Sequence, residues 1–212
     1  MNVDQSKPFF IAFEGIDGSG KSTQARMLAD SLQSIGYKVH LTFEPTDGPI
    51  GKMIRDIFNH KMQADDRTIA GLFVADRLDH ILNKQNGLLK MLADGYIVIT
   101  DRYYLSSYAY HGAHMPMDWV IASNSMAAEL LKPNLNIYIE MPVESSLQRV
   151  MRNRESVELY ETNENLKKVS EMYEAAILKL GSSEKIFRVN GDQEVGEIAK
   201  IIREKILELI NR

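Results

Sequence analysis

Glycine, lysine, serine and threonine residues have the spacing of a phosphate-binding segment in the run FEGIDGSGKST, residues 13–23. The spacing Gly15-x4-Gly20-Lys21-Ser22 is that of a phosphate-binding loop, whose consecutive backbone N–H groups face phosphate oxygens while Lys21 neutralises them and Ser22 reaches Mg²⁺. An ordinary glycine-rich turn is the alternative, but an apolar strand before the run and a helix after it favour a nucleotide site. We therefore expect ATP and Mg²⁺ as cofactors. The residues expected to contact ATP are Gly15, Ile16, Asp17, Gly18, Ser19, Gly20, Lys21, Ser22 and Thr23.

Asp101 and Arg102 follow a short apolar run, 96–100, of the kind found in strands that helices cover on both faces. At such a strand end Asp101 can hold the Mg²⁺ shell together with Ser22, and Arg102 can reach the phosphate of an acceptor. A strand that simply ends in polar residues is the alternative. Phosphoryl transfer depends on charge neutralisation and in-line positioning. We accordingly assign Lys21, Asp101 and Arg102 to catalysis, and Ser22 and Asp101 to the metal.

Arginines form a second basic cluster late in the chain, at Arg149, Arg152 and Arg154. We expect the polar segment 149–162 to be a lid that closes over ATP and presents a guanidinium to the migrating phosphoryl group. A solvated helix face balanced by nearby glutamates is the alternative interpretation. Arg149 and Arg154 are the candidates for a catalytic role, and the sequence leaves the choice open.

Asp17 lies inside the phosphate loop, where ATP phosphates would repel a carboxylate. We expect its side chain to face the acceptor or a metal-bound water instead, which would give it a part in catalysis. A local turn closed by the aspartate side chain is the alternative.

The composition fits one soluble α/β domain spanning 1–212. A net charge of −4 provides no basic field for gripping nucleic acid, and the absence of cysteine excludes disulfides and thiol chemistry. The first eight residues lack the pattern of a secretion signal, and no apolar run approaches the roughly 20 residues that span a bilayer. We expect a cytoplasmic protein with neither nucleic-acid nor membrane partners.

Apolar runs alternate with helical patterns along the chain. The alternation predicts an α/β fold with a five-stranded parallel sheet, helices on both faces and the three layers of P-loop NTPases. Because ligands of such sheets bind beyond the carboxyl ends of the strands, the phosphate loop, Glu44 and Asp101-Arg102 should converge. We expect strands at 9–13, 37–43, 96–100, 136–140 and 185–189. We expect helices at 22–36, 50–59, 67–93, 106–110, 118–131 and 142 to about 153. A further helix should end at 180, and a terminal helix should begin at 194.

With these motifs in place, the chain resembles thymidylate kinases, a family of P-loop nucleoside monophosphate kinases, over nearly its whole length. The resemblance rests on the phosphate loop, Glu44-Pro45, Leu72-Phe73-Val74-Ala75-Asp76-Arg77, Asp101-Arg102-Tyr103, Ser106-Ser107-Tyr108-Ala109-Tyr110-His111-Gly112 and Tyr160-Glu161. It implies transfer of the ATP γ-phosphate to dTMP, giving dTDP on the route to dTTP, with Mg²⁺. It also implies a homodimer.

The resemblance further implies roles for residues at the acceptor. Phe73 would stack on thymine and Arg77, four residues on, would contact the base; core packing is the alternative for Phe73. Arg102 would bind the acceptor phosphate, Ser107 would lie near the base, and Tyr110 would crowd C2′ so that deoxyribose is preferred. The full set expected at the substrate is Asp17, Glu44, Phe73, Arg77, Arg102, Ser107, Tyr110 and Tyr160.

Two positions depart from the pattern of the family. Phe43 precedes Glu44-Pro45 where many relatives have arginine, which places one phosphate contact in doubt. Gly18-Ser19 stands where some members carry an arginine, so the catalytic arginine would come from 149–154.

Two other functions compete with this interpretation. A deoxynucleoside kinase also has a phosphate loop and a Glu-Pro glutamate, but it typically has Glu-Arg-Ser where this chain has Asp101-Arg102-Tyr103. A non-catalytic ATP-binding regulator would bind ATP without turnover. A GTPase is disfavoured, because the nearest string to Asn-Lys-x-Asp, at 83–86, ends in asparagine.

Overall fold

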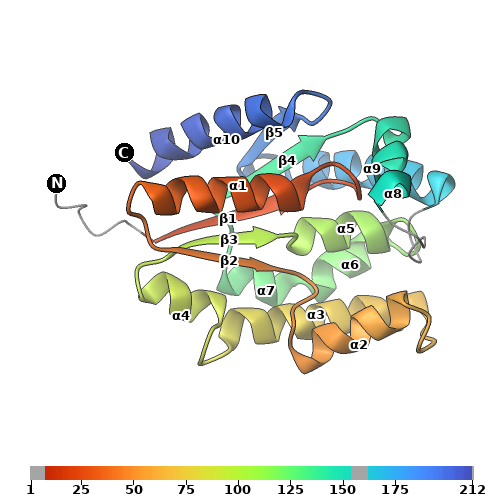
Figure 1. Ribbon diagram of the computed structural model, residues 1–212. Coiled ribbons are helices and arrows are strands. Elements are labelled where there is room, and N and C mark those ends of the chain that lie inside the picture. The colour runs from red at the N-terminus through yellow and green to blue at the C-terminus, as the bar shows by residue number, and fades with distance from the viewer. Residues whose placement is uncertain (1–7, 154–161, 212) are drawn as a thin grey trace.

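A five-stranded, all-parallel sheet in the order β2-β3-β1-β4-β5 forms the centre of the molecule (Figure 1). The structure is a computed structural model that describes residues 8–153 and 162–211. The predicted α/β fold with five parallel strands is confirmed. The strands are β1 (Phe9–Glu14), β2 (Val39–Phe43), β3 (Ile97–Asp101), β4 (Leu135–Glu140) and β5 (Ile186–Asn190).

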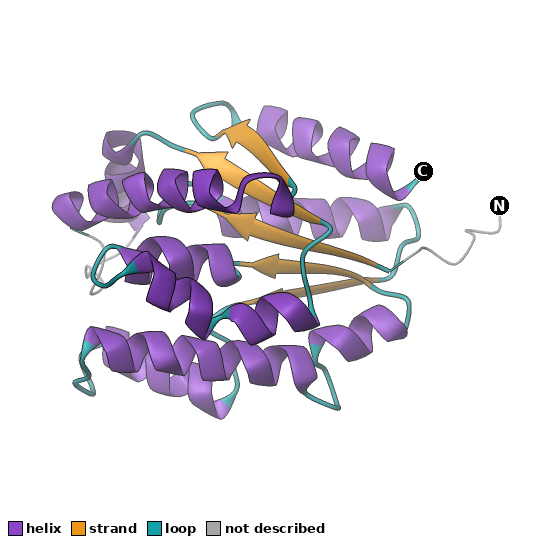
Figure 2. Ribbon diagram, turned by 180° about the vertical axis from the view of Figure 1, so that it is seen from behind, coloured by secondary structure: helices purple, strands orange, loops and turns teal. Residues whose placement is uncertain are grey.

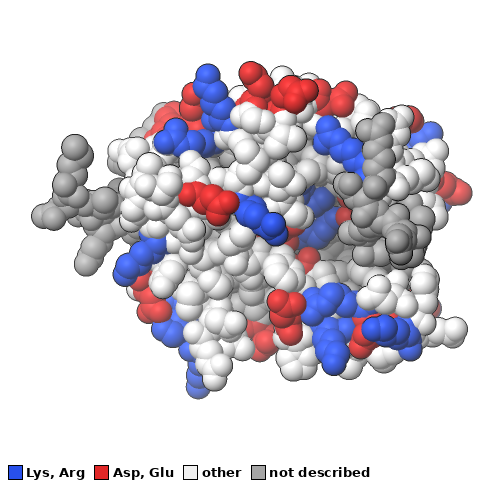
Figure 3. Space-filling view, viewed as in Figure 1, with Lys and Arg blue, Asp and Glu red and all other residues white. Residues whose placement is uncertain are grey.

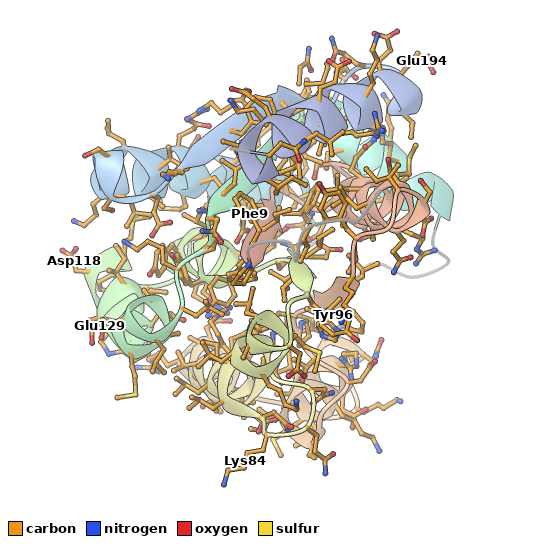
Figure 4. All side chains as sticks on the ribbon, turned by 90° about the vertical axis from the view of Figure 1, so that its left-hand side faces the viewer. Phe9, Lys84, Tyr96, Asp118, Glu129 and Glu194 are labelled. Carbon is orange, nitrogen blue, oxygen red and sulfur yellow. The ribbon has the colours of Figure 1, made fainter. Side chains whose placement is uncertain are left out.

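Strand β1 is buried on both faces because its apolar side chains alternate between two cores. Ile11 and Phe13 pack in one core with helices α1 and α10, while Phe10 and Ala12 pack in the other with helices α3 to α7 and α9. Seen from behind, the strands lie between these two layers of helices (Figure 2). Figure 4 shows Phe9, at the start of β1, between the layers, and Lys84 and Asp118 on the outside.

The helices are α1 (Lys21–Ser34), α2 (Pro49–Phe58), α3 (Asp66–Leu82), α4 (Leu88–Ala93), α5 (Tyr104–Gly112), α6 (Met117–Ser123), α7 (Ser125–Leu130), α8 (Val143–Asn153), α9 (Asn163–Leu180) and α10 (Val195–Ile210), with a 3₁₀ turn η1 (Gly181–Ser183). Among the described residues, none of these helices has the length and apolar character that crossing a bilayer requires.

Two predicted helices are wrong in that each is divided in two. The region 67–93 breaks after Leu82, where Asn83 leaves helical geometry and its side chain accepts the N–H of Gln85. The region 118–131 breaks at Asn124, whose side-chain amide donates to the carbonyl of Val120, 2.8 Å away. In both places an asparagine side chain competes for backbone hydrogen bonds, which a pattern of apolar spacing does not reveal.

The register of the sheet brings the site-bearing strand ends together. Phe13 of β1 and Phe43 of β2 both lie level with Asp101 of β3. The phosphate loop, Glu44 and Arg102, which follow these strands, therefore leave the sheet at the same edge, as the sequence predicts.

Candidate active site

A cavity of about 800 Å³ lies at the carboxyl ends of the strands, between the phosphate loop, the end of β3, helices α2, α3, α5 and α8, and the start of α10. Figure 3 shows lysines and arginines bordering a hollow on the side toward which the strands of Figure 1 point. The predicted site residues that line it are Asp17, Gly18, Ser19, Gly20, Lys21, Ser22, Thr23, Phe73, Asp101, Arg102, Ser107, Tyr110 and Arg149. One cavity thus contains both the phosphate loop and the Asp101-Arg102 pair.

The glycines allow the phosphate loop to pass close to α8 and to lead directly into α1. Gly18 has a φ of 78°, and a Cβ there would collide with the carbonyl oxygen of Ser146. Gly20, with a φ of 96°, caps α1 without a side-chain hydrogen bond. The N–H groups of the first helical turn are therefore available to phosphate oxygens, where the helix dipole also favours negative charge.

Lys21 is buried beneath the phosphate loop. Its ammonium donates to the carbonyl of Ile16, 2.7 Å away, and lies 3.5 Å from the hydroxyl of Ser19. Burial, with the charge of Arg102 in addition, lowers the pKa of Lys21 to about 8. The side chain thus keeps its proton at pH 7, and its poorly solvated charge favours an anion in the cavity.

Ser22 and Asp101 meet across the start of α1 and the end of β3. The hydroxyl of Ser22 donates to Oδ2 of Asp101. The other carboxylate oxygen, Oδ1, is buried and has no hydrogen-bond partner within 8–153 and 162–211. A hydroxyl and a carboxylate with an unused oxygen are the hard ligands that Mg²⁺ prefers, so these residues fit the predicted metal.

Arg102 is the centre of a polar cluster at the end of β3. Its guanidinium forms an ion pair with Asp17, lies 3.2 Å from the hydroxyl of Tyr110 and has its Cζ 4.8 Å from the centre of that ring. It also donates to the carbonyl of Gly15 at 3.3 Å and the hydroxyl of Ser106 at 3.1 Å. The Arg102 backbone has a φ of 74°, which is unusual for a bulky residue. The cluster therefore places Arg102, the residue predicted to bind the acceptor phosphate, next to the phosphate loop.

The carboxylate of Asp17 faces this cluster, and its expected contact with the acceptor or a metal-bound water stays a prediction. One carboxylate oxygen pairs with Arg102, and the other accepts the hydroxyl of Tyr110 at 2.7 Å. The same hydroxyl accepts the backbone N–H of Asp17 at 3.0 Å.

An aromatic wall bounds the cavity on the α3 and α5 side. The ring of Phe73 lies 5.1 Å from that of His111 and 6.0 Å from that of Phe58, and all three line the cavity with Ser107. Burial lowers the pKa of His111 to about 3, so its imidazole is neutral at pH 7. The wall is therefore aromatic and uncharged, and it suits a planar base.

Comparison with known proteins identifies the lineage of this fold and site. A sequence profile of the family described as thymidylate kinase matches residues 13–202. The chain belongs to the thymidylate kinase family. Its relatives include the thymidylate kinases of Sulfurihydrogenibium sp., 40% identical over 92% of this chain and 94% of that protein, and of Desulfotalea psychrophila, 35% identical over 94% and 95%. A probable thymidylate kinase of Pyrococcus horikoshii is 43% identical over 67% of this chain and 69% of that protein. As a member of this kinase family the chain is a phosphotransferase.

Arg77 and Glu44, predicted to face the substrate, lie behind the aromatic wall. Arg77 is 1% exposed, and its guanidinium donates twice to one carboxylate oxygen of Glu44, at 2.6 and 2.9 Å. It also donates to the hydroxyl of Ser107 at 3.0 Å and to Asn124. The second oxygen of Glu44 lies 3.0 Å from His80 Nδ1. In this family member the buried pair therefore holds Ser107, which does line the cavity.

The predicted lid is described only in part. Arg149 lines the cavity from α8 and donates to the carbonyl of Gly191 at 3.2 Å, so it stands over the phosphate-loop end of the site. Arg154, Tyr160 and the rest of 154–161 lie outside the described residues, and their roles stay predictions.

Two parts of the lining carry no sequence motif and were not predicted. Arg55 of α2 reaches the cavity while donating to the carbonyls of Pro45 at 2.8 Å and Thr46 at 2.6 Å. Residues 193–195, at the start of α10, border the phosphate-loop side. The available signal was position alone, because both segments follow soon after the end of a parallel strand.

Glu14, the last residue of β1, is another unpredicted feature, a fully buried carboxyl group. Burial raises the pKa of Glu14 from its ordinary value of 4.5 to about 7, against the hydrogen bond from Ser106 and the charge of Arg102. The native state therefore binds this proton more tightly than the unfolded chain does. The resulting stabilisation is complete below about pH 4.5 and is lost as the pH rises through about 7.

Replacing Glu14 by glutamine, which stays neutral, should remove this loss. Between pH 5 and pH 8 the free energy of unfolding of Glu14→Gln should rise by about 2.5 kcal/mol relative to the unmodified chain, which is most of the value of a pKa raised from 4.5 to about 7. Urea unfolding at several pH values measures the difference. Parallel curves for the two proteins would contradict the assignment.

Proposed function

We propose that this member of the thymidylate kinase family transfers the γ-phosphoryl group of ATP to dTMP and produces dTDP. The observation that supports the proposal most strongly is that one cavity is lined by both the phosphate loop and Arg102. A donor triphosphate on the loop and an acceptor phosphate on Arg102 would then face each other, which phosphoryl transfer in line requires.

On the donor side, Lys21 and the N–H groups that open α1 would hold the ATP phosphates. Ser22 and Asp101 would hold Mg²⁺, which when bound neutralises phosphate charge as the transition state develops. Arg149, next to Gly20 and bonded to the carbonyl of Gly191, would cover the nucleotide from α8.

On the acceptor side, Arg102 would bind the phosphate of dTMP and Phe73 would stack on thymine, with Ser107 near its edge. Asp17 and Tyr110 would border the sugar. Arg55 supplies a second guanidinium to the cavity that Phe43 also lines, and it would take the part of the arginine that many relatives have at position 43.

A deoxynucleoside kinase is disfavoured by the position of Glu44. In such an enzyme this glutamate acts as base toward a hydroxyl acceptor, and it must reach the substrate. Here its carboxylate is 1% exposed and held by Arg77 and His80 behind the wall. The buried ion pair leaves it unable to take that part.

The test is a coupled assay with ATP and Mg²⁺ in which thymidine, dTMP, dUMP, dCMP and dGMP are offered separately. We expect dTMP to be used with the highest kcat/KM and thymidine to be a poor substrate. Faster use of thymidine would refute the proposal in favour of a nucleoside kinase, and ATP binding without turnover of any acceptor would favour a regulator.

The ring of Tyr110 is expected to exclude a 2′-hydroxyl. Tyr110→Ala should reduce the ratio of kcat/KM for dTMP over its ribose counterpart by at least about tenfold, because a steric barrier is removed. Tyr110→Phe keeps the ring and should keep the ratio, which separates crowding from the loss of the hydroxyl. An unchanged ratio in the alanine variant would remove Tyr110 from this role.

A homodimer and a cytoplasmic location also form part of the proposal, and they rest on the family resemblance and on the use of cellular ATP. Light scattering of the purified chain tests the first, and fractionation of the source cells tests the second.

A further inference from the structure

A buried polar hub lies directly behind Arg102. Its centre is the carboxylate of Glu14, which is 0% exposed and accepts three hydrogen bonds. The donors are the backbone N–H of Tyr103 at 3.0 Å, the hydroxyl of Ser106 at 2.6 Å and the hydroxyl of Tyr173 at 3.1 Å. They belong to the loop after β3, to α5 and to α9, so one carboxylate joins three elements to the end of β1.

Ser106 links this hub to Arg102. A serine hydroxyl has one hydrogen, and here it is donated to Glu14. The lone pairs of the oxygen are thereby directed to other donors, and Arg102 supplies one at 3.1 Å. With glutamine at position 14, the amide oxygen would stay on the N–H of Tyr103 and the amide nitrogen, which only donates, would face Ser106. The hydroxyl hydrogen would then turn toward the guanidinium, which also offers only donors.

Tyr173 extends the hub into α9 and back to the phosphate loop. Its hydroxyl lies 2.8 Å from that of Ser106 and 3.2 Å from the carbonyl oxygen of Gly15, which also accepts a hydrogen bond from Arg102. Its ring meets those of Tyr110 and Tyr138 at centroid distances of 6.3 and 5.2 Å. The orientation of Arg102 is thus tied to α9 and to the first residue of the phosphate loop.

A buried carboxyl group needs a reason, because burial of a charge is costly and an apolar residue is often as stable or more so. We propose that Glu14 is a positioning residue that orients Arg102 for the acceptor phosphate through the hydroxyl of Ser106, with Tyr173 fixing that hydroxyl from α9. The inference rests on the proposed function, since it gives Arg102 an acceptor phosphate to bind.

The test compares Glu14→Gln with the unmodified chain in the dTMP assay. We expect KM for dTMP to rise about tenfold, the value of a hydrogen bond to a charged group, while KM for ATP changes by less than about twofold. In an Arg102→Ala background the same substitution should have no further effect, because Glu14 acts through Arg102. Glu184→Gln is the matched control. Glu184 is also a buried carboxyl group, bonded to Tyr104 and Asn136, and its substitution should leave both KM values unchanged.

Ser106→Ala cuts the link while leaving Glu14 its other partners, and it should give the same effect on dTMP alone. This variant carries the test if Glu14→Gln does not fold. Equal rises in both KM values, an undiminished effect in the Arg102→Ala background, or the same result in Glu184→Gln would overturn the proposal.

The unmodified chain separates this inference from the proposed function. If it phosphorylates dTMP and the variants behave like it, only the inference fails. If it does not, the proposed function fails, and a ligand-free crystal structure of Glu14→Gln decides the inference by itself. If the Arg102 guanidinium no longer contacts Ser106 in that structure, the positioning role of Glu14 is supported. If the guanidinium keeps its place, the inference is overturned.

Discussion

Lys21→Ala is expected to lower kcat by about 10³-fold or more while the chain keeps its fold. The ammonium of Lys21 lies beneath the phosphate loop, 2.7 Å from the carbonyl of Ile16, in a place shielded from water. A charge held there acts most strongly when negative charge moves onto the phosphoryl oxygens, so its loss raises the barrier more than it weakens binding. Steady-state assays with saturating ATP and dTMP measure kcat directly.

Two controls separate this effect from damage to the fold. The far-ultraviolet circular dichroism of Lys21→Ala should match that of the unmodified chain. Lys205→Ala, on the surface of α10, should keep full activity, since that lysine pairs only with Glu208 and the face of Phe187 among the contacts described. A kcat for Lys21→Ala within tenfold of the unmodified value would remove the phosphate loop from the chemistry.

Arg102→Ala is expected to lower kcat/KM for dTMP by about 10²- to 10³-fold, as truncation of a buried, hydrogen-bonded charge does. Most of the loss should lie in KM for dTMP, since the guanidinium is proposed to bind the acceptor phosphate, and KM for ATP should change little. Arg102→Lys should recover only part, because an ammonium lacks the planar fork that fits phosphate.

The matched control for Arg102 is Arg188→Ala. Arg188 also pairs with carboxylates, Glu140 and Glu174, and also lies against a tyrosine ring, but it stands on β5 outside the cavity lining. Its removal should leave kcat/KM unchanged. A loss below fivefold in Arg102→Ala, or an equal loss in Arg188→Ala, would contradict the role of Arg102.

The sequence predicted those parts of the site that follow directly from strand ends. Ser22 and Asp101 meet, and Asp17 lies beside Arg102, because parallel strands deliver their loops to one edge of the sheet. The sequence placed these residues at strand ends, but it did not show that Arg102 also contacts Tyr110 and Ser106.

The rest depended on contacts that spacing does not encode. The face of α3 was predictable, but capture of the Arg77 guanidinium by Glu44 was not, since that pair comes from segments 33 residues apart. The helix break at Asn124 reflects one side-chain amide that competes with the backbone. The burial of Glu14 could not be predicted for a similar reason. Its hydrogen-bond partners come from segments far away in the sequence, which lie next to β1 only in the folded protein.

The left-handed backbone of Arg102 places the conformational preference of the chain against the needs of its side chain. Arg102 has a φ of 74°, with its N–H bonded to Phe13 and the Thr100 hydroxyl bonded to its carbonyl. Glycine would occupy that conformation with about 1 kcal/mol less strain. The same substitution would remove the guanidinium that pairs with Asp17, and loss of one partner of a largely buried pair costs more than the strain relieved. Thermal endurance and turnover therefore both favour arginine at this position, although its backbone geometry favours glycine.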